Sequence, residues 1–229
     1  MKLERVLVYV FLFALAFWLL KRTACHGCHF GFGGFRGSGH VVSEDRSVGD
    51  FSAIEATAVI DIILRQGEST SLKIEADDNI LPKIETENED GRLKISMPKN
   101  FQLGKSTSLK AFITIKNLDE LEVTGVSKIT CESPLVLDHF KLNFTGVGDV
   151  NLRGSCNDAT FSNTGVGDVD AVDFVCKNLQ IENSGTGDMR CRADVELSIE
   201  NSGVGNVEYA GTATLKSVSS TGVGHVKKI

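Results

Sequence analysis

The sequence predicts an all-β fold: a right-handed parallel β-helix (solenoid) with coils of about 19–20 residues, preceded by an N-terminal hydrophobic helix. The main observation is a recurring phrase, Thr/Ser-Gly-x-Gly-Asp-Val, whose last two positions vary between copies. Its copies begin at Thr145, Thr164, Ser184, Ser202 and Thr221, in steps of 19, 20, 18 and 19 residues. Short runs that alternate apolar and polar residues flank each copy, which is typical of strands with one buried face. The body shows no pattern of a long amphipathic helix.

Residues 1–22 are predicted to be a signal or anchor segment. An uncharged apolar run of 15 residues, from Val6 to Leu20, lies between basic residues on both sides. A signal-peptide core has about 7–15 apolar residues and a spanning helix about 20, so this run lies at the boundary. Arg22 stands where cleavage after Ala24 requires a small residue, which favours an uncleaved anchor with the body outside the cytoplasm. The alternatives are a cleaved, secreted form and a form lipidated at Cys25.

Residues 23–39 are rich in glycine and are predicted to be a flexible tether. Within it, Cys25, Cys28 and His29 match the Cys-x-x-Cys-His pattern of c-type haem attachment. A bound haem needs an apolar pocket, and this sequence predicts none, so we expect no cofactor here. The alternatives are haem, a transition-metal site that also uses His26, a local disulfide, and acylated or unpaired thiols.

Residues 40–229 are predicted to form one domain with an acidic surface. The chain has 24 basic and 30 acidic side chains, and its first 36 residues hold five basic groups and one acidic group, so the remainder has a net charge of −10. Nucleic-acid binding needs a basic face, so the charge excludes nucleic acid as a partner.

This body divides into an irregular part, residues 40–120, and a regular part, residues 121–229. In the irregular part, alternating runs at 59–64, 71–75, 92–97 and 111–116 predict strands. In the regular part, each phrase is followed by a short strand, a polar connector and a second strand that leads to the next phrase. Thr124, Gly125 and Val126 begin a degenerate first copy.

Stacked coils place equivalent residues above one another at the strand spacing of about 4.8 Å. Two apolar ladders are predicted inside, one of Val150, Val169, Met189, Val207 and Val226, and one of Phe161, Ile181 and Ile199. Asn163, Asn183 and Asn201 are predicted to form an amide stack before the turn. The glycines of the phrase are predicted to serve the corner through positive φ angles. They are Gly146, Gly148, Gly165, Gly167, Gly185, Gly187, Gly203, Gly205, Gly222 and Gly224.

The chain resembles the putative auto-transporter adhesin, head GIN domain family over roughly residues 40–228. The residues that carry this resemblance are the segments 46–54, 60–67, 76–81 and 90–95, together with the repeated Gly-x-Gly-Asp phrases. The resemblance implies an exported bacterial protein with an all-β, β-helix-like fold. It implies no catalytic residues, and the cysteines and histidines of the tether are not part of the family's pattern.

Asp149, Asp168 and Asp188 occupy one position of the phrase on successive coils and are candidate calcium ligands, because Ca²⁺ prefers oxygen ligands. Asn206 and His225 replace Asp in the last two copies, so turn capping is the favoured role.

Among the other reactive side chains, Cys156 and Cys176 lie on adjacent coils, where a disulfide is one alternative. Cys131 and Cys191 are predicted to be small core residues. His139, beside Asp138, is predicted to lie in a solvated turn.

These observations favour a non-enzymatic binding or structural module at the cell envelope, in the manner of an adhesin. The expected partners are a membrane, through the N-terminal segment, and a surface glycan or protein. One alternative is a polysaccharide-active β-helix enzyme that uses the repeated Asp position. The other is a membrane-tethered haem or metal protein.

Overall fold

The computed structural model describes residues 34–98, 100–104 and 108–229, and residues 35–229 form one compact unit. The predicted anchor and the Cys25, Cys28 and His29 cluster lie outside the described residues. Within the described part, no helix is long and apolar enough to cross a membrane. The described elements are β1 (Val41–Arg46), β2 (Ala53–Ala56), β3 (Asp61–Gln66), β4 (Ser71–Asp77), the short 3₁₀ helix η1 (Leu81–Lys83), β5 (Glu85–Glu89), β6 (Arg92–Ser96), β7 (Leu109–Ile115), β8 (Glu120–Val123), β9 (Ile129–Cys131), β10 (Leu135–Phe144), β11 (Val150–Asn163), β12 (Val169–Asn183), β13 (Met189–Asn201), β14 (Val207–Ala210), β15 (Thr214–Ser220) and β16 (Val226–Lys228).

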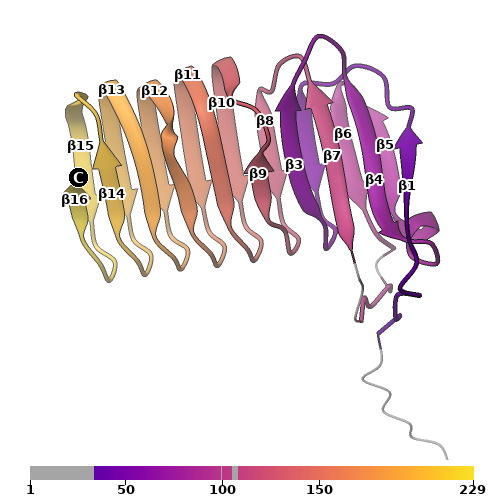
Figure 1. The fold of residues 1–229 in the computed structure, drawn as a ribbon. Helices are drawn as coiled ribbons and strands as arrows, with labels where there is room; N and C mark the ends of the chain where they lie inside the picture. Colours follow the sequence, from indigo (N-terminus) through magenta and orange to yellow (C-terminus); the bar gives the residue numbers. More distant parts are fainter. Residues whose placement is uncertain (1–33, 99, 105–107) are drawn as a thin grey trace, which may run out of the picture. The chain divides into compact units, whose positions relative to one another are not determined.

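The unit is an all-β solenoid, as the sequence predicts (Figure 1). The first face is a parallel stack of β6, β2, β8, β10, the later halves of β11, β12 and β13, and β15; from β8 onwards these strands precede the glycine turns. The second face is a parallel stack of β7, β3, β9, the early halves of β11, β12 and β13, and then β14 and β16; from β9 onwards these strands follow the glycine turns. The hand of the solenoid stays a prediction.

The predicted polar connectors of the regular part are not separate turns. In β11, β12 and β13 the strand continues from the second face into the first, so each coil has one long bent strand. The pairing shifts register between Asn151 and Arg153 of β11 and between Ala171 and Val175 of β12, which lets the chain bend without leaving the ladder. The sequence suggested a connector because polar residues gather here, but their backbone groups still pair with the neighbouring coils.

The strand register confirms the predicted ladders. Val150 pairs with Val169, which pairs with Met189, and the series continues through Val207 to Val226. Phe161, Ile181 and Ile199 also stand in register and are buried. The three asparagines form a buried amide ladder. Its side-chain donor–acceptor distances are 3.0 Å from Asn163 to Asn183 and 2.9 Å from Asn183 to Asn201.

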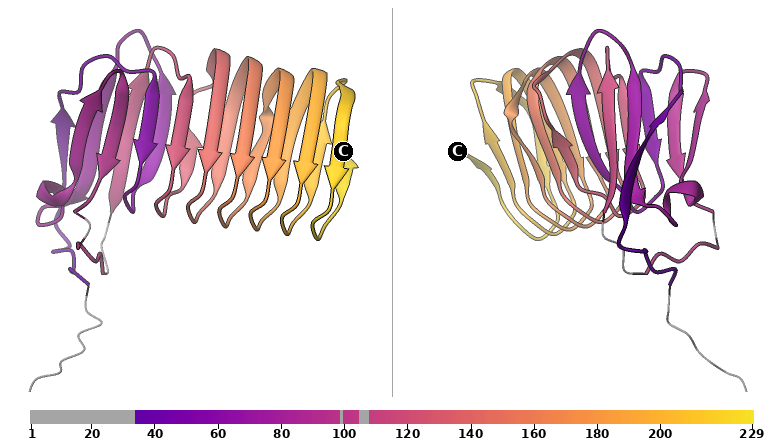
Figure 2. Two further views of the ribbon diagram at one scale, coloured as in Figure 1. Left: turned by 180° about the vertical axis from the view of Figure 1, so that it is seen from behind. Right: turned by 45° about the vertical axis from the view of Figure 1, so that its right-hand side comes forward.

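The two glycines of each phrase have different tasks, and positive φ belongs only to the second. Gly148, Gly167, Gly187, Gly205 and Gly224 have φ between +133° and +145°. The first glycine is needed for close backbone contact instead. A Cβ on Gly165, for example, would lie 2.3 Å from the carbonyl oxygen of Gly146 on the preceding coil. The turns form one edge of the solenoid (Figure 2).

The solenoid begins earlier than the repeated phrase. Val59, between β2 and β3, stacks on Val126, and the Lys128 amide donates to Asp61 at 3.1 Å. Thr57-Ala58-Val59-Ile60-Asp61 is therefore a diverged copy of the phrase. A further coil, β6 and β7, packs outside it although it follows in sequence. The antiparallel strands β4 and β1 then extend the second face beyond β7, and β5 extends the first face beyond β6.

Candidate functional site

A polar groove of about 420 Å³ crosses the outside of the first face. It extends over β10, β11, β12 and β13, where the side chains that point away from the core gather. Its floor is the sheet itself, and apolar residues such as Phe140 and Leu197 pack beneath it in the core. The lining polar residues are Asp119, His139, Lys141, Asp158, Thr160, Asn178, Gln180, Glu196 and Ser198.

Strand register arranges this lining as two rows. One row is His139, Asp158, Asn178 and Glu196, on four successive strands. The other is Lys141, Thr160, Gln180 and Ser198, two residues further along each strand. Each step along a row equals the strand spacing of about 4.8 Å. The groove therefore presents donors and acceptors at a regular interval along the solenoid axis.

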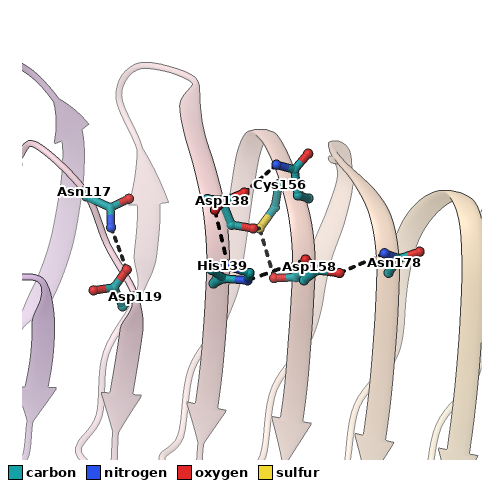
Figure 3. Close-up of polar contacts among 8 residues, drawn as sticks. Asn117, Asp119, Asp138, His139, Cys156, Asp158 and Asn178 are labelled. Carbon is teal, nitrogen blue, oxygen red and sulfur yellow. Dashed lines mark hydrogen bonds and ion pairs between the residues drawn. The ribbon is translucent and has the colours of Figure 1, made fainter.

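Asp158 is at the centre of the contacts in the groove (Figure 3). It accepts a hydrogen bond from the Asn178 side chain at 2.8 Å, and its other oxygen lies 3.5 Å from His139 Nδ1. The Nε2 atom of His139 lies 3.3 Å from Asp138. His139 lies on strand β10, so the prediction that it lies in a turn was wrong. Its side chain is 69% exposed, which confirms the predicted exposure to solvent.

Glu120, on β8, contacts residues at one end of the groove. It forms a salt bridge with Arg92, accepts from Asn143 at 2.9 Å, and lies 3.7 Å from Lys141. The hydrogen bond from Arg92 holds the pKa of the Glu120 carboxyl below its ordinary value, against the opposing effect of burial. Lys141 is thus positioned over the groove by a carboxylate that stays ionised.

The repeated aspartates lie at the corner of the solenoid, away from this groove. Asp149 accepts the backbone N–H of Asp168 at 3.2 Å, Asp168 accepts that of Asp188 at 2.8 Å, and Asp188 accepts that of Asn206 at 2.7 Å. Each carboxylate thus links one coil to the next. The described residues contain no group of three or more His, Cys, Asp or Glu side chains suited to a metal ion.

The four described cysteines are buried free thiols, so Cys156 and Cys176 are not joined by a disulfide although they face each other in register. The Cys156 thiol instead lies 3.2 Å from the Asp158 carbonyl oxygen. Burial raises the pKa of Cys156 to about 11 and that of Cys191 to about 12. It also raises the pKa of Cys131 and Cys176. A raised pKa keeps these thiols protonated and poor nucleophiles.

The sequence reasoning missed the groove residues Asp158, Asn178 and Glu196. A signal was present: each lies five residues before a member of the asparagine ladder. It also missed an exposed apolar ridge at the middle position of the phrase. This ridge consists of Val59, Val126, Val147, Val166, Thr186, Val204 and Val223, and its valines are 39–71% exposed.

Several solved structures are similar to the chain. A crystal structure described as a putative adhesin from Bacteroides fragilis matches with a TM-score of 0.73 and 26% identity, covering 86% of this chain and 100% of that one. A putative adhesin from Parabacteroides merdae matches with a TM-score of 0.54 and 20% identity, over 85% and 98% of the two chains. A putative lipid binding protein from Parabacteroides distasonis matches with a TM-score of 0.51 and 18% identity, over 85% and 99%. The last two matches show the fold alone.

No curated protein matches the chain. One family profile matches residues 50–213, which include the diverged first copy of the phrase and the groove. The chain therefore belongs to the family described as "putative auto-transporter adhesin, head GIN domain".

Proposed function

We propose that the chain is a non-enzymatic binding module of the cell envelope, held to a membrane by its N-terminal segment with its body outside the cytoplasm, and that its polar groove binds a surface glycan. The family and the similar structure from Bacteroides fragilis support a surface-binding role. The observation that supports a glycan as the ligand is the groove itself. Its rows of carboxylates, amides and hydroxyls, repeated at the strand spacing, offer regular partners to a polyhydroxylated chain.

The contacts in the groove favour binding over catalysis. Glycoside hydrolysis needs a carboxylic acid that delivers a proton. Glu120 is held ionised by Arg92, Asp158 already accepts from Asn178, and Glu196 lies 2.9 Å from Lys216. The repeated aspartates on which the enzymatic alternative relied are engaged with backbone amides at the corner. We propose that the module acts without a cofactor.

The test begins with a glycan array, which identifies the glycans that the full 229-residue chain binds in mild detergent. The affinity for these glycans is then measured in solution. Asp158→Ala should weaken binding roughly tenfold or more, as expected when a charged hydrogen-bond acceptor is lost. Asp170→Ala is the matched control, because Asp170 also has a partner, Arg190, but lies on the second face. Equal losses in the two variants, or no bound glycan, would contradict the proposal. Release of a shortened glycan that Asp158→Ala abolishes would establish an enzyme instead.

The anchoring is tested by the N-terminal mass of the mature protein isolated from membranes. An intact N-terminus supports an uncleaved anchor, whereas a truncated or acylated one shows processing. An absorption spectrum of the same sample that contains a Soret band would show bound haem and overturn the cofactor-free proposal.

A further inference from the structure

The two ends of the solenoid carry opposite charges on their outermost strands. At the N-terminal end these strands are β1 and β5, and at the C-terminal end they are β15 and β16. The N-terminal pair has five acidic residues and one arginine: Glu44, Asp45, Glu85, Glu87, Glu89 and Arg46. The C-terminal pair has three lysines and no acidic residue: Lys216, Lys227 and Lys228. All of these acidic and lysine side chains are exposed. Two ends of one molecule are therefore electrostatically complementary.

Both ends are also open sheet edges. Among the described strands, β1 pairs only with β4, β5 only with β6, β15 only with β13, and β16 only with β14. The outer side of such a strand presents backbone N–H and C=O groups that can pair with another chain. The two ends can thus offer each other hydrogen bonds as well as charge.

The last coil leaves apolar side chains uncovered that inner coils bury. Leu215 is 42% exposed, whereas Leu197, its partner in register on β13, is 0% exposed. Val218 is 46% exposed, whereas its partner Ile199 is 1% exposed. Repeat proteins need terminal units that close the stack, and among the described strands only those at the N-terminal end add antiparallel strands beyond the last coil. One more layer of strands on the C-terminal end would cover these side chains.

The topology determines which strands of two copies could meet. β15 belongs to the first face, whose opposite end is β5, and β16 belongs to the second face, whose opposite end is β1. A copy translated along the solenoid axis brings β1 of one molecule beside β16 of the next. β5 then faces β15 across a gap of one strand, because two strands (β4 and β1) extend the second face beyond β7 and only β5 extends the first face beyond β6. β1 and β16 would run parallel, which is an ordinary strand pairing.

We propose that copies of this chain associate end to end, with the basic C-terminal edge of one copy against the acidic N-terminal edge of the next. Pairing of two C-terminal ends is disfavoured, because lysines would face lysines. A contact between two different surfaces that does not close into a ring produces an open chain of molecules. Such a chain would align the polar grooves of successive copies, and this inference does not depend on what the groove binds.

Charge reversal at each end gives the sharpest test, by sedimentation velocity of the full chain in density-matched detergent. The wild-type chain should associate at low salt, with an apparent affinity roughly tenfold or more weaker at about 0.5 M salt than at about 20 mM. Lys227→Glu/Lys228→Glu makes both ends acidic, and Glu85→Lys/Glu87→Lys/Glu89→Lys makes both ends basic, so each variant alone should stay monomeric. A mixture of the two restores complementary ends and should associate again.

Lys128→Glu/Lys177→Glu is the control for Lys227→Glu/Lys228→Glu, because it changes the net charge by the same amount at exposed positions away from both ends. It should associate as the wild type does. Far-ultraviolet circular dichroism confirms that each variant is folded, and the mixture serves as a second check, since misfolded variants could not rescue each other. A wild-type chain that is monomeric at low salt, or variants whose mixture fails to associate, would overturn the proposal.

Discussion

Replacing Asn183 by alanine should lower the free energy of unfolding by about 2–4 kcal/mol. Asn183 lies in the middle of the buried ladder, where it accepts from Asn163 at 3.0 Å and donates to Asn201 at 2.9 Å. The substitution removes both hydrogen bonds and leaves a donor on Asn163 and an acceptor on Asn201 without these partners. Both neighbours are at most 1% exposed, so water cannot readily replace the lost contacts. Each such buried polar group costs about 1–3 kcal/mol.

The matched control is Asn178→Ala, on the same strand. Asn178 loses one hydrogen bond, to Asp158, at a site open to solvent, so its cost should stay below about 1 kcal/mol. Urea unfolding followed by circular dichroism measures both. With a slope of about 1–3 kcal/mol per molar urea, Asn183→Ala should lower the midpoint by about 0.7 M or more. Equal midpoints for the two variants would refute the claim that the asparagine ladder stabilises the stack.

Three further predictions concern the corner, the core and the Glu120 contact. Gly165→Ala should lower the melting temperature by about 4 °C or more, because the new Cβ would meet the backbone of the preceding coil. Gly167→Ala should lower it as well, because a φ of +142° strains any residue with a side chain. An unchanged melting temperature in either variant would contradict these assignments. Burial raises the pKa of the Cys156 thiol in the folded state from 9.0 to about 11. The stability that the protonated thiol contributes is therefore complete below pH 9 and is lost as the pH rises towards 11. Urea unfolding at several pH values should show this loss of stability, and Cys156→Ala should make the loss smaller. The lowered pKa of Glu120 contributes stability that is complete above the ordinary pKa of 4.5 and is lost as the pH falls through the folded-state pKa. Arg92→Met should make this loss of stability at low pH smaller. An identical pH dependence of stability at low pH in the two proteins would argue against the Arg92–Glu120 salt bridge as its cause.

The sequence predicted the regular half of the fold because each coil repeats the same positions. Parallel stacking places like residues in register, so the period of the phrase alone identified the inner ladders and the asparagine ladder. The irregular half was harder, because the diverged copy at Thr57–Asp61 has Ala58 in place of the first glycine and lies 67 residues before the next copy at Thr124. The chain between them builds an outer coil and its covering strands, an order in space that no local pattern encodes.

The candidate site could be predicted only in part. The polar residues that lie between the two predicted strands of each coil were interpreted as connectors, because a polar run without a clear period is typical of a loop. Their role appears only when four strands stand side by side and bring His139, Asp158 and Asn178 into one row. The repeated aspartates misled in the other direction, since a regular carboxylate row resembles a ligand site but serves the backbone of the next coil.

The central claim, that the groove on the first face is the binding surface, is tested most directly by carboxyl footprinting with and without a bound glycan. The method labels exposed carboxylates and locates each label by mass spectrometry. We predict that the glycan reduces labelling of Asp158 and Glu196 in the groove and leaves that of Asp149 and Asp168 at the corner unchanged. Reduced labelling at the corner aspartates, with Asp158 and Glu196 unaffected, would contradict the account and place the ligand beside the valine ridge.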